Sequence, residues 1–293
     1  MRYLDPVALA KLRNLTLNLR RISAEGHLTG RHRSAAKGLS HEFAQHRAYV
    51  PGDEIKALDW KVFARQERFY VRQYQSENIL NGMVLLDVSG SMAYAEGGRP
   101  AKWENACRLA MAAAFLVLAE GDAVGLATFD TQPREFIPPR SSFGQLEVLN
   151  SLLGRCRASG ETDLSAALEA AAARIRRRSL VVLISDLLGD SDAILKVVKA
   201  LQARRHELMV LQVLDPAERD FDFSGPTVFR GLEDQRELFC DASSLQEAYR
   251  EAFLRQQKLY EAGFHGAAIS YMSFFTDRPW EEDLARFLGR RAP

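Results

Sequence analysis

The chain has 293 residues, of which 47% are hydrophobic and 26% are charged, as in a globular protein with a core of ordinary size. Its formal net charge of +1 gives no overall reason to expect nucleic acid or an anionic membrane as the partner. The longest strongly apolar run, residues 109–119, is shorter than the about 18–20 residues needed to cross a bilayer. It therefore predicts a buried helix and no membrane span.

The cysteines and the start of the chain favour a cytoplasmic location. Cys107, Cys156 and Cys240 are odd in number and widely separated, so they predict neither a disulfide framework nor a cysteine zinc site. The first residues also lack the apolar core of a signal peptide. We therefore expect a protein of the reducing cytoplasm.

Residues 1–80 are predicted to form a first region, distinct from the rest of the chain. Residues 1–38 are rich in Arg and Lys and predict a basic arm, with a helix over 6–24 and a loop over 25–38. Pro51-Gly52-Asp53 has the chemistry of a turn, and the aromatic and β-branched segment 69–74 predicts a strand. We expect this region to pack beside the second domain and to leave the basic arm free for an acidic partner surface.

Residues 81–293 alternate between short apolar segments and helical segments. Unbroken apolar runs such as 83–86 are typical of strands buried on both faces of a parallel sheet. The pattern predicts strands at 83–86, 124–129, 134–137, 180–184, 208–214 and 237–240, an extended piece at 267–275, and helices at 100–120, 143–154, 164–176, 192–204, 243–262 and from Pro279. This alternation predicts an α/β fold, a doubly wound, mostly parallel sheet with helices on both faces.

Three segments place oxygen-bearing side chains where open parallel sheets bind ligands, beyond the carboxyl ends of the strands. They contribute Asp87, Ser89 and Ser91 after strand 83–86, Thr162 in the loop before a helix, and Asp186 after strand 180–184. Oxygen ligands without His or Cys select a hard divalent cation, with Mg²⁺ favoured by the small hydroxyls and Mn²⁺ or Ca²⁺ as alternatives. Because few of these ligands are anionic, an open coordination position would attract a carboxylate from another protein.

The same residues have a simpler interpretation. Ser, Thr and Asp residues that follow a strand are also common helix N-caps. For Ser91 or Thr162 taken singly, the capping and metal-binding interpretations weigh equally. For the five residues together, we favour the metal site.

These residues also resemble a known motif. Asp87-x-Ser89-x-Ser91, with Thr162 and Asp186 downstream, is similar to the metal-ion-dependent adhesion site of von Willebrand factor A domains, which have a Rossmann-like fold. The upstream residues resemble a bacterial family known as domain of unknown function 58, through Arg47-x-Tyr49-x-Pro51-Gly52-Asp53, Asp59-Trp60, Ala64-Arg65, Glu77 and, near the end, Thr276-Asp277. Lys56 departs from that family, where Arg is more usual.

The resemblance implies a function that the residues alone do not. It implies an adaptor or co-chaperone of a MoxR-type AAA+ ATPase, with a protein client that supplies the acidic ligand. We interpret Arg47, Asp53, Asp59 and Arg65 as a structural ion-pair network, and Trp60 as a packing anchor. The client and the pathway are not indicated.

Two other classes of function are weaker. Gly90-Ser91-Met92-Ala93 resembles the nucleophile segment of subtilisin-type serine hydrolases, but the Asp and His of a triad are not in their expected motifs. The basic arm could bind nucleic acid, although no known nucleic-acid-binding module is present. The chain also lacks a Gly-x-x-x-x-Gly-Lys-Ser/Thr loop, so ATP hydrolysis would fall to a partner. We therefore predict that the protein is not an enzyme.

Overall fold

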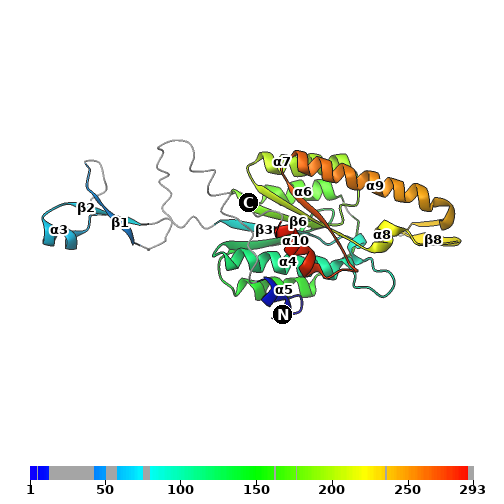
Figure 1. Cartoon of the computed structure of the whole chain (residues 1–293), viewed down its shortest axis with the longest axis horizontal. Coiled ribbons are helices and arrows are strands. Elements are labelled where there is room, and N and C mark those ends of the chain that lie inside the picture. Colours follow the sequence, from blue (N-terminus) through cyan, green and yellow to red (C-terminus); the bar gives the residue numbers. More distant parts are fainter. Residues whose placement is uncertain are drawn as a thin grey trace. The chain divides into compact units, whose positions relative to one another are not determined.

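The computed structural model describes residues 1–4, 6–12, 43–50, 58–74, 80–161, 163–175, 177–234 and 236–289. The chain divides into two compact units, Met1–Ile22 with Leu80–Pro293, and Ser23–Ile79 (Figure 1). The division falls near residue 80, and it assigns the first 22 residues to the larger unit rather than to the smaller one. The predicted loop 25–38 and the turn 51–53 lie outside the described residues.

The larger unit is built on a six-stranded sheet with the predicted α/β architecture. In chain order its strands are β3 (Asn81–Asp87), β4 (Ala123–Phe129), β5 (Pro133–Arg140), β6 (Ser179–Ser185), β7 (Glu207–Leu214) and β10 (Ser270–Phe275). In space the order is β10-β7-β6-β3-β4-β5, and all neighbours are parallel except β4 and β5. The chain therefore winds outward in both directions from β3 and β6, as in a doubly wound fold.

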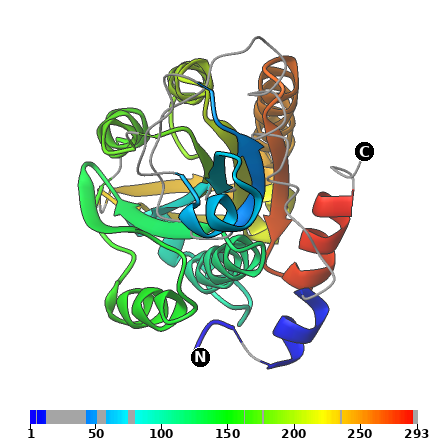
Figure 2. The same cartoon turned by 90° about the vertical axis from the view of Figure 1, so that its left-hand side faces the viewer.

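Helices cover both faces of this sheet (Figure 2). One face carries α1 (Pro6–Leu12), α4 (Lys102–Ala119), α5 (Gln145–Arg155) and α10 (Trp280–Gly289), and the other carries α6 (Leu164–Ala173), α7 (Ser191–Ala203) and α9 (Ala242–Gly266). Along β3, Val84 and Leu86 pack in the first core, whereas Met83 and Leu85 pack in the second. Because successive side chains of a strand point to opposite faces, an unbroken apolar strand supplies both cores.

The edge strand β5 is longer than predicted, since it continues through Pro138 and Pro139. Proline cannot donate a ladder hydrogen bond, but an edge strand has one side without a partner, so proline is tolerated there. The β4–β5 pairing is irregular around Gly125, where a Cβ would lie 2.5 Å from the Ile137 carbonyl oxygen. Glycine thus permits the close approach of the two backbones at this irregularity.

Three short elements after β7 form a projection at one end of the sheet. They are α8 (Pro216–Asp220) and the antiparallel hairpin strands β8 (Pro226–Arg230) and β9 (Glu237–Asp241). The sequence analysis predicts β9 but neither α8 nor β8. The helix α8 begins with a capping box, in which Asp215 and Glu218 each accept a hydrogen bond from the other's backbone N–H.

The smaller unit pairs β1 (Phe43–Ala48) with β2 (Tyr70–Tyr74) in antiparallel fashion. Between them lies α3 (Trp60–Gln66), a helix that the sequence analysis does not predict. The Asp59 carboxylate caps this helix by accepting hydrogen bonds from the backbone N–H groups of Lys61 and Val62. The rings of Phe63 and Phe69 stack with their centroids 4.4 Å apart.

Two interpretations of the upstream motif can be compared with this unit. Trp60 lies at the first turn of α3, where its ring packs edge-on against Phe63 and is 55% exposed. Its role as a packing anchor stays a prediction. The side chains of Arg47 and Asp53 lie outside the described residues, so the ion-pair network stays a prediction.

Candidate metal centre

The candidate site lies where β3 and β6 run side by side at the centre of the sheet. Asp87 is the last residue of β3, and Asp186 directly follows β6. Strand order reverses between these two strands, which is the position where doubly wound sheets bind ligands. Both carboxylates are buried. The sheet thus brings together two acids that are 99 residues apart in the chain.

Local hydrogen bonds orient the Asp87 carboxylate. Its Oδ1 accepts a hydrogen bond from the Ser89 N–H at 2.9 Å, and its Oδ2 accepts one from the Ser185 hydroxyl at 2.6 Å. Ser89 and Ser91 are also buried, and their hydroxyl oxygens lie 3.0 Å apart. The structure therefore gathers Asp87, Ser89, Ser91 and Asp186 at one end of the sheet.

The fifth predicted ligand, Thr162, lies outside the described residues. Its loop can nevertheless be followed up to Glu161. The Gly160 carbonyl accepts a hydrogen bond from the Gly90 N–H at 2.9 Å, and the Ser159 N–H donates to the Val88 carbonyl at 2.9 Å. The loop before Thr162 thus borders the segment that carries both serines.

The capping interpretation does not describe the serines. Gly90–Ala93 forms a single 3-10 turn, and Ser91 lies inside it rather than at its N-cap. Ser89 occupies the N-cap position, but its side chain makes no capping hydrogen bond. The N-cap of α6 is Asp163, whose carboxylate accepts from the Ala166 N–H. Both serine hydroxyls therefore face each other instead of capping a helix.

Lys102 is a buried charge that the sequence analysis misses. Its Nζ lies 2.7 Å from Asp186 Oδ2 and 2.6 Å from Glu218 Oε1. Burial alone would lower the pKa of this ammonium, but the two carboxylates outweigh burial and raise it. A sequence signal did exist, because Lys102 opens a helix, where the backbone N–H groups disfavour a cation.

The charges of this cluster do not balance. Asp87, Asp186 and Glu218 bring three carboxylates, and Lys102 brings one ammonium, so the fully ionised cluster carries a net charge of 1 − 3 = −2. Burial, and then the negative charge of Asp186, raise the pKa of Asp87 to about 7. A bound proton on Asp87, or a divalent cation, would offset this excess negative charge.

The geometry of the hydroxyls fits Mg²⁺. An octahedral ion with ligands at about 2.1 Å places adjacent ligand oxygens about 3.0 Å apart, which is √2 times the bond length. The Ser89 and Ser91 oxygens have that separation. Within the described parts of the chain, no three His, Cys, Asp or Glu side chains are grouped to hold a metal.

Among the described residues, no hydrogen-bonded triad surrounds Ser91. Its hydroxyl is hydrogen-bonded to Ser89, and in the described structure no hydrogen bond joins it to a histidine. A serine nucleophile needs a base within hydrogen-bonding reach.

Comparison with known proteins identifies the family. Residues 45–262 match the family described as "Protein of unknown function DUF58". The chain belongs to the DUF58 family. The family that the Asp87-x-Ser89-x-Ser91 and upstream motifs predict is thereby confirmed, and so is the α/β fold.

Relatives of this DUF58 protein include uncharacterised proteins of Mycobacterium tuberculosis (Rv1480) and Mycobacterium bovis (Mb1516). Each is 29% identical over 294 residues, which cover 98% of this chain and 90% of the relative. Similar solved structures include BatB from Bacteroides thetaiotaomicron, with 16% identity, coverage of 72% of this chain and 98% of that one, and a TM-score of 0.44. A von Willebrand factor type A structure from Catenulispora acidiphila is 15% identical. The match covers 64% of this chain and 44% of that one, with a TM-score of 0.35.

The apolar run 109–119 lies in α4, which is buried as predicted. Among the described helices, none combines the length and the hydropathy of a membrane span.

Proposed function

We propose that this DUF58 protein is a non-enzymatic protein-interaction module that holds one divalent cation, with Mg²⁺ preferred over Mn²⁺ or Ca²⁺. Its ligands would be Asp87, Ser89, Ser91, Thr162 and Asp186. The observation that supports this function best is the pair of buried hydroxyls, 3.0 Å apart, beside a cluster with an excess of negative charge. When bound, the cation supplies a positive charge with an open position that accepts a partner's carboxylate.

The surrounding residues hold the ligands in place. Ser185 and the Ser89 N–H keep the Asp87 carboxylate oriented, and the Leu188 N–H does the same for Asp186 through its Oδ1 at 3.1 Å. Gln212 donates a hydrogen bond to the Asp186 carbonyl at 2.9 Å. Such outer contacts fix the orientation of ligands and contribute to metal affinity.

The partner follows from the family resemblance alone. We propose that a MoxR-type AAA+ ATPase in the cytoplasm is the partner, with this chain as its adaptor or co-chaperone and a client protein as the source of the carboxylate. The absence of a phosphate-binding Gly-x-x-x-x-Gly-Lys-Ser/Thr loop supports a division of labour in which the partner hydrolyses ATP.

Calorimetric titration of Mg²⁺, Mn²⁺ and Ca²⁺ into the full chain tests the metal centre. We expect about one ion per chain. Asp87→Ala should weaken binding by at least about 100-fold, the upper range for residues that only support a ligand. Asp87→Asn, which keeps the shape of the side chain, is the second variant in case the alanine variant does not fold.

Asp190→Asn is the matched control for this titration. Asp190 lies four residues after Asp186 but caps α7 through the Asp192 and Ala193 N–H groups, and asparagine is an equally good cap. Equal affinities of the unchanged chain and Asp87→Asn would contradict the proposed centre. A pull-down of a MoxR-type ATPase in Mg²⁺ and in chelator then tests the partner. Equal amounts of bound ATPase under both conditions would contradict metal-dependent docking.

A further inference from the structure

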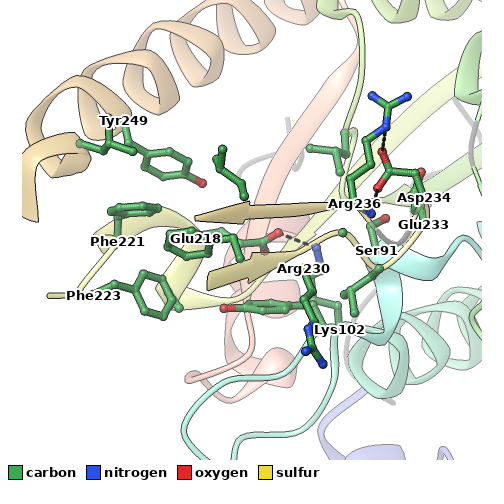
Figure 3. A pocket seen from close by; sticks show the side chains of 18 of the residues that line it. Ser91, Lys102, Glu218, Phe221, Phe223, Arg230, Glu233, Asp234, Arg236 and Tyr249 are labelled. Carbon is green, nitrogen blue, oxygen red and sulfur yellow. Dashed lines mark hydrogen bonds and ion pairs between the residues drawn. The ribbon is translucent and has the colours of Figure 1, made fainter. Parts of the chain in front are cut away.

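A cavity of about 990 Å³ opens directly beside the candidate metal centre (Figure 3). One end is lined by Ser91 and the tip of the β8–β9 hairpin, and the other end by Phe221, Phe223 and Tyr249, with Lys102 and Glu218 between them. Its volume is at the upper end of the about 300–1,000 Å³ that ligand pockets span. The cavity therefore admits a segment of several residues rather than one side chain.

Aromatic rings form one wall of the cavity. Phe221 stacks on Tyr249 with centroids 4.2 Å apart and on Phe229 at 5.4 Å. Phe223 meets both Phe221 and Phe229 edge-on at 5.3 Å. Because each ring packs against its neighbours, the protein itself fixes the shape of this apolar wall.

Exposed aliphatic side chains surround the same opening. Leu188, Leu232, Leu238 and Leu245 all line the cavity, yet each remains substantially exposed. Single exposed leucines are ordinary, but several that converge on one hollow are typical of an interaction site. Because the Leu232 carbonyl lies against Gly90, beside Ser91, this apolar surface reaches the candidate metal centre.

The hairpin has two faces with different roles. Phe229 is paired with Leu238 across the strands, and both line the cavity. Val228 is paired with Phe239 in the next register position, and neither lines it. Since successive residues of a strand point to opposite faces, the cavity side and the outer side can be altered separately.

The hairpin tip connects the cavity to the metal-binding segment. A Cβ placed on Gly90 would lie 2.5 Å from the Leu232 carbonyl oxygen, so the tip rests against the backbone between Ser89 and Ser91. At its base the hairpin is held by a hydrogen bond from the Ala242 N–H to the Gly225 carbonyl. The hairpin thus spans the distance from α9 to the serine loop.

The two ends of the cavity require different chemistry. The Ser91 end requires a carboxylate if a cation with an open position is bound there, and the Phe229 end requires an apolar group. We infer that the cavity binds a polypeptide segment of a partner protein, with an Asp or Glu side chain at the cation and a neighbouring aromatic or large aliphatic side chain against Phe229 and Leu238. This inference rests on the proposed function and adds the apolar contact that selects the partner.

Selection from a phage library of random dodecapeptides, on the full chain in Mg²⁺, tests the inference. We expect enriched peptides to carry Asp or Glu within a few positions of Phe, Tyr, Trp or Leu. A labelled copy of the most enriched peptide is then measured by fluorescence anisotropy. Its affinity should fall at least about tenfold in Leu238→Ser, which corresponds to about 1.4 kcal/mol of binding free energy.

Phe239→Ser is the matched control. Phe239 is the next residue, is more exposed than Leu238 at 75% against 59%, and lies outside the cavity lining, so its loss should leave peptide affinity unchanged. Because both side chains are largely exposed, neither substitution endangers folding. Equal loss in both variants, or no loss in Leu238→Ser, would overturn the inference, as would the absence of any enriched peptide.

Metal titration separates this inference from the proposed function. Suppose that Mg²⁺ binds, that Asp87→Asn abolishes Mg²⁺ binding, and that Leu238→Ser leaves peptide affinity unchanged. The metal centre is then supported and the proposed apolar contact is wrong. If peptide affinity is unchanged both in chelator and in Asp87→Asn, the peptide carboxylate does not bind the cation. The inference is then wrong.

Discussion

Lys102 is a cation at the start of a helix, yet it is completely buried. Helix N-termini favour anions, so this placement is unfavourable without compensation. The compensation comes from Asp186 and Glu218, which both contact its ammonium group. At the residue scale, the Lys102 ammonium thus offsets one of the negative charges of the acidic cluster.

Lys102→Met removes the ammonium and retains the length of the side chain. In chelator, we expect the free energy of unfolding to fall by about 3–5 kcal/mol, the range for breaking a buried ion pair. Mg²⁺ should recover part of this loss, so the metal should raise the stability of Lys102→Met more than that of the unchanged chain. Denaturant unfolding with chelator and with Mg²⁺ measures both effects.

The exposed Lys196 on α7 offers a matched control for that substitution. Lys196→Met should change the free energy of unfolding by no more than about 0.5 kcal/mol. If Mg²⁺ stabilised Lys102→Met no more than it stabilises the unchanged chain, the cation would not replace the Lys102 ammonium beside Asp186. This account of the cluster would then be wrong.

Asp215 is another buried carboxylate, and its partners keep it ionised. It accepts hydrogen bonds from Arg99 at 2.9 Å, from the Ala217 N–H at 2.9 Å and from Thr276 at 2.9 Å. Burial alone would raise its pKa, but these hydrogen bonds, that of Arg99 first, lower it below its usual value. The ionised form therefore stabilises the folded state.

Asp215→Asn should lower the free energy of unfolding by about 1.5–3 kcal/mol near neutral pH, the range for hydrogen bonds to charged groups. A lowered pKa contributes stability above the unfolded value of about 3.9, and this contribution is lost as the pH falls through the folded value. The difference between the two proteins should therefore shrink below about pH 4. Unfolding curves at several pH values measure it, and a difference that does not change with pH would contradict this account.

At the scale of elements, the close contact between the β8–β9 tip and the serine loop depends on Gly90. A methyl group there would meet two backbone oxygens, that of Leu232 at 2.5 Å and that of Gly160 at 3.0 Å. Backbone atoms yield less easily than the end of a flexible side chain. Gly90 thus lets three chain segments meet at the candidate metal centre.

Gly90→Ala should destabilise the fold by about 1–3 kcal/mol, as overpacking commonly does. It should also speed hydrogen exchange in the hairpin more than in the central strands, because the hairpin tip loses its contact with the backbone at Gly90. Exchange measured by mass spectrometry gives both regions at once. Gly154→Ala is the control, because nothing lies within 4 Å of a Cβ added there and its φ is not positive. Unchanged exchange in the hairpin would show that the contact with Gly90 does not hold the tip.

Among the elements, the helices and buried strands of the sheet domain were predictable because their apolar periodicity is local. The sequence analysis misses α8, although Pro216 at its first turn and Glu218 three residues after Asp215 are a recognisable capping signature. It also misses β8 and α3, both of which are short. Short elements carry too few residues for periodicity to reveal them.

At the scale of the whole molecule, the first residues of the chain belong to the core of the sheet domain. Leu4, Ala8 and Leu12 are buried in the same hydrophobic cluster as residues of α4 and α10. The predicted basic arm is therefore anchored at its start, while the rest of it, from residue 13, lies outside the described residues.

Leu12→Ala should lower the free energy of unfolding by about 2–5 kcal/mol, because it leaves a cavity in a closed core. The adjacent Lys11 is exposed, so Lys11→Ala should cost no more than about 0.5 kcal/mol. Thermal or denaturant unfolding of the full chain compares the two. Equal small effects would mean that the first helix is not part of the cooperative core.

The sequence by itself determined the family, the alternation of strands and helices, and four ligand candidates that the sheet brings together. These features depend on local patterns and on the rule that ligands bind at the carboxyl ends of parallel strands. Only the tertiary structure revealed the ion-pair cluster of Lys102, Asp186 and Glu218. It also revealed the cavity beside Ser91 and the contact of the hairpin tip with Gly90. Lys102 is 84 residues from Asp186 and 116 from Glu218, and no local pattern records which distant side chains a sheet brings into contact.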